Sequence, residues 1–99
     1  MKLKVQSIHF DADKKLIEFI QERVDKLIHF YEDIIDGEVF LKLENSSDMK
    51  NKITEIRLKT PGKILCAKQH CRSFEEATDN AVEALRKQIT RHKEKVRGV

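Results

Sequence analysis

Hydrophobic and polar residues alternate at the start of the chain. Leu3 and Val5 are separated by charged or polar residues, and the alternation continues to Ile8. Because successive side chains of an extended strand point to opposite faces, this pattern puts the apolar residues on one side and the polar ones on the other. It predicts a half-buried strand over residues 2–8.

The next segment has apolar residues at intervals of three and four, which is typical of a helix with one buried side. These residues are Leu16, Ile17, Ile20, Val24, Leu27, Ile28 and Tyr31. Asp13 stands just before them and is a residue type that caps helices well. The spacing predicts a helix of about four to five turns, and Asp36-Gly37 breaks the pattern.

Three further stretches alternate with a period of two and are predicted as strands. The first covers residues 38–44, the second follows a polar run over 45–51 that we expect to be a loop, and the third covers 63–72. Pro61-Gly62 supplies a tight turn between the last two, so they form a hairpin. The residues expected to face inward are Val39, Leu41 and Leu43, then Ile56 and Leu58, then Leu65 and Ala67.

Ser73 and Glu76 form a capping box, which marks the start of a last helix that we expect to run to the end of the chain. Its apolar stripe consists of Ala77, Ala81, Val82, Leu85, Ile89 and Val96. At about 100° per residue, the basic residues of this helix spread over the other side and are free to reach outward.

The order strand, helix, three strands, helix predicts an α+β fold with both helices on one face of a four-stranded sheet. The first two strands are joined through a helix and are expected to be parallel, followed by an antiparallel meander. The other face of the sheet stays open to water. Phe40 and Ile64 lie on that face, where either a partner interface or scattered apolar exposure would explain them.

The composition fits a single domain over residues 1–99. Hydrophobic residues make up 39% and charged residues 37% of the 99 residues, a mixture expected of a soluble globular domain. The N-terminus lacks the apolar stretch of a signal peptide, so we expect a cytoplasmic protein with no membrane partner. Cys66 and Cys71 fall on opposite faces of a predicted strand and are expected to remain reduced thiols.

Charge is distributed unevenly along the chain. Six basic residues and a single acidic one, Glu94, lie between Arg86 and Arg97, while the net charge of the whole chain is only +3. The remainder is therefore slightly acidic. A basic last helix on such a body favours one orientation on a polyanion.

The sequence contains no recognisable catalytic motif. It contains no glycine-rich phosphate loop, nucleophile elbow or paired-histidine motif, so we expect neither an enzyme nor a cofactor. Cys66, His70, Cys71 and His92 match no standard zinc spacing, and we expect no metal. His92, at the edge of the apolar stripe, is open to a packing role or to stacking on RNA.

The run Leu85–Lys93 reads leucine, basic pair, glutamine, aliphatic and then a basic-histidine-lysine group. It closely resembles the last helix of the ribosome hibernation-promoting factor and ribosome-associated inhibitor family. Three other segments also fit this family: the first strand, the helix that begins two residues before Lys15, and the Thr60-Pro61-Gly62 turn. The resemblance therefore covers essentially the whole chain. The sequence departs from the family at Ser73–Asp79, where the common pattern is Asp-Met-Tyr-Ala-Ala-Ile-Asp. Without an acidic tail or a second domain in these residues, it resembles the short form.

The resemblance implies a fold similar to double-stranded-RNA-binding domains and a place in the channel between head and body of the small ribosomal subunit. Members of the family exclude tRNA and messenger RNA there and silence translation under stress or in stationary phase. The implied partners are the small subunit and its rRNA, with ribosomal proteins as further contacts and no DNA, and the free chain is expected to be a monomer. The residues expected to bind rRNA are Arg23, Lys26, Arg86, Lys87, Arg91, Lys93, Lys95 and Arg97.

Two other functions remain open at this point. The family's older description implies a regulatory domain that acts on a protein, an alternative sigma factor. A general binder of double-stranded RNA would use the same basic helix but bind any long duplex equally well. Salt-sensitive binding to the small subunit, and competition by free duplexes, distinguish these alternatives.

Overall fold

The structure is a computed structural model that describes residues 2–8, 10–31, 33–44 and 51–96, with the backbone alone for residues 2 and 92–96. Its elements follow the predicted order. They are β1 (Lys2–Ile8), α1 (Lys14–Phe30), β2 (Asp36–Leu43), β3 (Lys52–Thr60), β4 (Lys63–Cys71) and α2 (Phe74–Val96).

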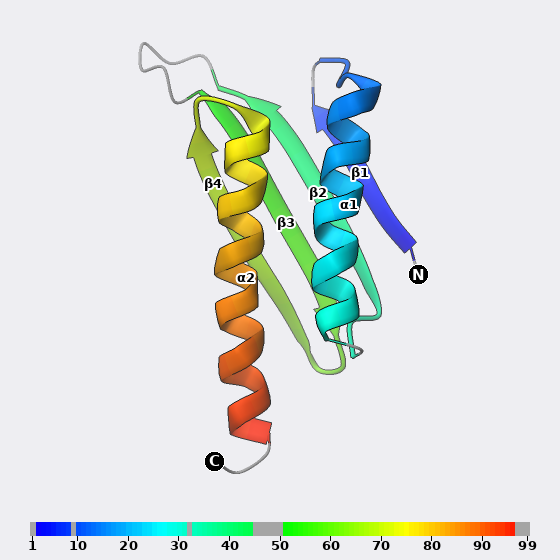
Figure 1. The fold of residues 1–99 in the computed structure, drawn as a ribbon, viewed down its shortest axis with the longest axis vertical. Coiled ribbons are helices and arrows are strands. Elements are labelled where there is room, and N and C mark those ends of the chain that lie inside the picture. The colour runs from blue at the N-terminus through cyan, green and yellow to red at the C-terminus, as the bar shows by residue number, and fades with distance from the viewer. Residues whose placement is uncertain (1, 9, 32, 45–50, 97–99) are drawn as a thin grey trace.

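The four strands form one sheet in the order β1-β2-β3-β4. β1 and β2 are parallel and are joined through α1, whereas β2, β3 and β4 form an antiparallel meander. Figure 1 shows α1 and α2 side by side on one face of the sheet, with α1 over the β1–β2 half and α2 over the β3–β4 half. The predicted α+β fold is confirmed.

The core lies between the two helices and the face of the sheet that they cover. From the sheet it takes Val39, Leu41, Ile56, Leu58, Leu65 and Ala67, and from the helices Ile20, Val24, Leu27, Ala81, Leu85 and Ile89. Full burial of one such large aliphatic side chain contributes about 1.5–3 kcal/mol relative to an exposed one. This apolar contact fixes α2 on the sheet and thereby fixes the direction of its polar side.

Leu43 continues the alternation of Val39 and Leu41 but is not part of the buried core, since it is 45% exposed. Leu43 is the last residue of β2 and pairs with Lys52, the first residue of β3. Alternation along a strand gives the side to which a residue points. It does not say whether another element covers that position, and few of the described residues cover this end of the sheet.

The predicted turns and caps are found with one difference. The backbone N–H of Glu76 donates a hydrogen bond of 3.1 Å to Oγ of Ser73, as expected of the capping box. Asp13 occupies the N-cap of α1, but its side chain makes no capping hydrogen bond. Gly62 has a φ of 76°, a conformation that glycine adopts without the steric cost of a Cβ atom, and it closes the β3–β4 hairpin.

Strand β4 forms one edge of the sheet and is linked to α2 by side chains. Nε2 of Gln88 donates a hydrogen bond of 3.0 Å to the backbone carbonyl of Cys66. Nδ2 of Asn80 lies 3.4 Å from Sγ of Cys71. Cys66 is exposed and Cys71 is buried, and both are free thiols, which confirms that they lie on opposite faces. Among the described residues, no helix combines the length and apolar character needed to span a membrane.

Candidate nucleic-acid interface

The polar side of α2 carries three basic residues whose side chains are described. Arg86, Lys87 and Arg91 are all exposed, while Leu85 and Ile89 on the opposite side of the helix are fully buried. Lys87 and Arg91 are four residues apart and therefore neighbours on the helix surface. With Glu83 and Thr90, the three basic residues border a shallow depression of about 400 Å³.

Arg86 is oriented by an aromatic ring from the other helix. Its guanidinium carbon lies 5.6 Å from the ring centre of Phe30, the last residue of α1. Such a cation–π contact contributes about 0.5–1 kcal/mol at an exposed site. It leaves the outer N–H groups of Arg86 able to donate to an acceptor in solution.

Arg23 of α1 is engaged within the protein. Its Nε lies 3.1 Å from Oδ1 of Asp79 on α2, and its guanidinium carbon lies 4.8 Å from the ring centre of Phe19. Nε is buried and has no aligned hydrogen-bond acceptor among the described residues, so the contact with Asp79 is an ion pair only. The carboxylate of Asp79 therefore offsets the positive charge of Arg23, a residue that the sequence predicts to bind rRNA.

Lys26 is held more weakly. Its Nζ lies 3.8 Å from Oε1 of Glu22 one turn earlier, with both side chains more than 60% exposed. An exposed ion pair of this kind contributes at most about 0.5 kcal/mol. Lys26 can therefore exchange this partner for a phosphate at little cost.

For the other residues that the sequence predicts to bind rRNA, the structure does not describe the side chains. Lys93 and Lys95 belong to α2, but only their backbone is described, and the same holds for His92. Arg97 lies outside the described residues. Figure 1 shows the last turns of α2 extending beyond the β3–β4 hairpin, away from the sheet.

The two helices run in the same direction, which sets how the predicted residues are grouped. Arg23 meets Asp79 near the start of α2, and Phe30 meets Arg86 further along both helices. Arg86, Lys87 and Arg91 form one cluster on α2, while Arg23 and Lys26 lie on α1. Sequence reasoning missed Asp79 and Phe30 as partners of these arginines, because no local pattern signals a contact between the two helices.

Two further observations limit the chemistry of the described residues. Burial first, and then the negative charge of Asp33 and a hydrogen bond to it, raise the pKa of Tyr31 above its ordinary value. Tyr31, which follows α1, therefore adds no negative charge near neutral pH. In the described part of the chain, no three histidine, cysteine or acidic side chains come together as metal ligands would.

These features define a small α+β fold in which an exposed basic cluster lies on one of two helices that pack on the same face of the sheet. Residues 3–97 match the family described as sigma 54 modulation protein / S30EA ribosomal protein, and the chain belongs to this family. The family resemblance seen in the sequence is thereby confirmed.

Individual proteins agree with this assignment. The chain is 26% identical over 85 residues to the ribosome hibernation promotion factor of Deinococcus radiodurans. That match covers 84% of this chain but only 44% of the relative, so the chain spans less than half the length of that protein.

Two solved structures share the fold. A ribosomal subunit interface protein from Coxiella burnetii superposes with a TM-score of 0.82 at 16% identity, covering 94% of this chain and 98% of the other. The N-terminal domain of Thermus thermophilus Protein Y gives a TM-score of 0.73 at 17% identity, covering 91% and 94%. At these identities the likeness establishes the fold alone.

Proposed function

We propose that this chain is a ribosome hibernation factor that binds the small ribosomal subunit through rRNA and occupies the tRNA and messenger RNA channel. By filling that channel it inhibits translation under stress or in stationary phase. It acts in the cytosol as a monomer when free. The observation that carries the proposal is the exposed basic cluster Arg86, Lys87 and Arg91 on a helix fixed to the sheet, in a member of this family.

The cluster has the properties that phosphate binding requires. Long cationic side chains on a rigid helix can each meet a phosphate without the support being reorganised. Helical RNA has a deep, narrow major groove, so α2 would recognise the shape of the backbone rather than the bases. Specificity would then come from the arrangement of rRNA in the subunit, and inhibition from steric occupancy alone.

Co-sedimentation with purified small subunits tests the proposal. We expect the double variant Lys87→Glu/Arg91→Glu to lose binding by about 100-fold or more, since two phosphate contacts become repulsions of about 1.4 kcal/mol or more each. The same variant should no longer displace tRNA from the subunit. Unchanged binding by this variant would contradict the proposal.

A matched control separates this effect from net charge. Lys14→Glu/Lys15→Glu makes the same change of charge at the start of α1, where both lysines are exposed. Arg23 of α1 meets Asp79 and Phe30 meets Arg86, so the start of α1 lies at the end of the helix pair that is remote from Arg86 and Arg91. It should bind subunits within about threefold of the unaltered chain, because charges further than about 10 Å from the interface are screened at 0.1 M salt. An equal loss in both variants would mean that charge alone, without an oriented helix, drives binding.

The family description itself supports a second candidate, modulation of sigma 54. In that case the chain would bind a sigma factor with little dependence on Lys87 and Arg91, and subunits would not compete. A general double-stranded-RNA binder would instead be displaced from subunits by any long RNA duplex. Competition experiments with the three partners distinguish these functions.

A further inference from the structure

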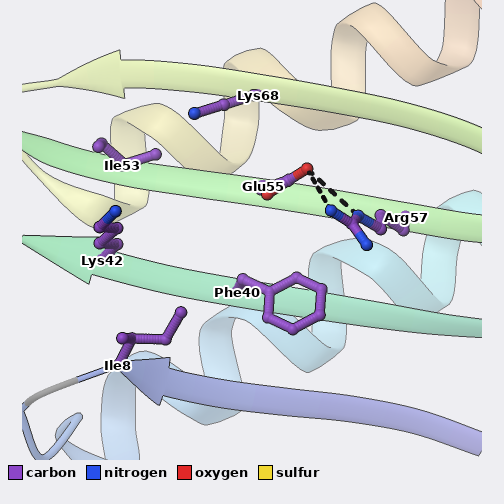
Figure 2. A pocket seen from close by; sticks show the side chains of 7 residues that line it. All are labelled: Ile8, Phe40, Lys42, Ile53, Glu55, Arg57 and Lys68. Carbon is purple, nitrogen blue, oxygen red and sulfur yellow. Dashed lines mark hydrogen bonds and ion pairs between the residues drawn. The ribbon is translucent and has the colours of Figure 1, made fainter.

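None of the described helices or strands covers the face of the sheet opposite α1 and α2 (Figure 1), and this face contains a hollow of about 300 Å³. All four strands contribute to it, from Ile8 of β1 to Lys68 of β4 (Figure 2). This volume is at the lower end of that of small-molecule sites. It is large enough for one planar ring, and it lies away from the basic side of α2.

The floor of the hollow is apolar. Ile53 of β3 lines the hollow and is only 4% exposed. Phe40 of β2 and Ile8 of β1 continue this floor towards the other edge (Figure 2). Ile8 and Phe40 are partly exposed, and such apolar and aromatic surface favours a ligand with an aromatic face.

The rim of the hollow has an excess of positive charge. Oε2 of Glu55 lies 3.2 Å from both Nε and Nη2 of Arg57, so this carboxylate is already engaged. Figure 2 shows the Glu55 side chain directed toward Arg57. Lys42 and Lys68 line the same hollow and have no ion-pair partner among the described residues, so two amines remain for an anion.

We propose that this hollow binds a short single-stranded RNA segment, with one base over the apolar floor and neighbouring phosphates at Lys42 and Lys68. β2 and β4 are separated by β3, so the two lysines stand roughly 10 Å apart and can hold the backbone on both sides of the base. The guanidinium of Arg57 lies over the ring of Phe40, 5.2 Å from its centre, so a base would stack against this guanidinium–ring pair. Aromatic platforms with flanking cations bind single strands with little dependence on sequence.

A peptide fits the hollow less well. Peptides that join a sheet do so at an edge, through free backbone groups. The hollow is centred on β2 and β3, each of which is hydrogen-bonded to strands on both sides. An acidic peptide could still meet the lysines, so it belongs in the test as a competitor.

The site is independent of the proposed subunit binding, and its test uses free oligonucleotides. We would measure the fluorescence anisotropy of a labelled uridine hexanucleotide with the intact chain and with Lys42→Glu/Lys68→Glu. The variant should bind at least tenfold more weakly. Lys59→Glu/Lys63→Glu, with the same change of charge at the hairpin end of β3, should stay within about twofold, as expected for a localised site.

A second variant separates stacking from charge. Phe40→Leu keeps an apolar side chain but removes the ring, and it should weaken hexanucleotide binding severalfold while leaving the salt dependence unchanged. Far-ultraviolet circular dichroism of each variant should match that of the unaltered chain, which shows that the sheet is intact.

Three results would overturn the site. These are equal losses in the sheet variant and its hairpin control, tighter binding of a glutamate-rich hexapeptide than of the hexanucleotide at the same hollow, or loss of hexanucleotide binding only in Lys87→Glu/Arg91→Glu. The last result would leave the subunit proposal standing. If the sheet variant alone loses the hexanucleotide while the helix variant alone loses the subunit, the chain has two separate RNA-binding surfaces.

Discussion

The basic residues of the two helices differ in what surrounds them. On α1, Arg23 lies 3.1 Å from Asp79, and Lys26 lies 3.8 Å from Glu22. On α2, Arg86, Lys87 and Arg91 have no carboxylate partner among the described residues, and Arg86 instead contacts the ring of Phe30. Two helices with similar basic residues therefore differ in available charge. The number of cations in a segment does not give the number that can bind phosphate.

The largest expected difference is between one arginine of each helix. Arg91→Glu should weaken binding to the small subunit by about 10- to 100-fold, because a phosphate contact becomes a repulsion of about 1.4–2.7 kcal/mol. Arg23→Gln should weaken binding by less than about threefold, since Asp79 already offsets its charge. Equilibrium binding of labelled subunits at fixed salt measures both, and similar losses would remove the distinction between the helices.

The salt dependence of binding sharpens the same comparison. If five or six phosphates are neutralised, the logarithm of affinity should fall against the logarithm of salt with a slope of about −4 to −5. Arg91→Gln should make this slope less steep by about 1, which amounts to roughly fourfold in affinity over a fourfold change in salt. Arg23→Gln should leave the slope nearly unchanged. A slope near zero for the unaltered chain would exclude phosphate binding as the main interaction.

Releasing Arg23 from Asp79 should strengthen binding to the small subunit instead of weakening it. Asp79→Asn removes the carboxylate but keeps the size of the side chain, so Arg23 becomes available and subunit binding should tighten by about two- to threefold at low salt. The free energy of unfolding should fall by no more than about 1 kcal/mol, as for other exposed ion pairs. Weaker binding would show that the Arg23–Asp79 pair orients a residue needed at the interface.

The smallest effect is expected at the exposed pair within α1. Glu22→Gln should change subunit binding by less than about twofold and stability by less than about 0.5 kcal/mol, because this i,i+4 pair is weak. Binding and urea denaturation of the same preparation give both values. A change as large as that of Asp79→Asn would mean that the pair restrains Lys26 more than its exposure indicates.

Local patterns predicted most of the fold. The alternation over residues 2–8 gave the bounds of β1, and Ser73 and Glu76 gave the start of α2. Each depends on residues close together in the sequence, where backbone geometry fixes which side chains share a face. The exposure of Leu43 was not predicted, because it depends on where the neighbouring elements end.

The site was predicted less completely for a similar reason. The basic cluster of α2 follows from the helical period, since its residues are within two turns of one another. The partners of Arg23 and Arg86 come from the other helix, and only the packing of α1 against α2 brings them together. Binding of rRNA by any of the eight residues remains a prediction from sequence, and for Lys93, Lys95 and Arg97 the same holds for the position of the side chain.

The hydrogen bond from Gln88 to the carbonyl of Cys66 affects how copies of the chain meet one another. An unpaired border strand is a template on which another molecule can extend the sheet and begin aggregation. At this point on β4 the acceptor is already taken, so an incoming strand would first have to break the bond to α2. The helix that carries the cationic cluster thus competes with any incoming strand for this acceptor on the border of the sheet.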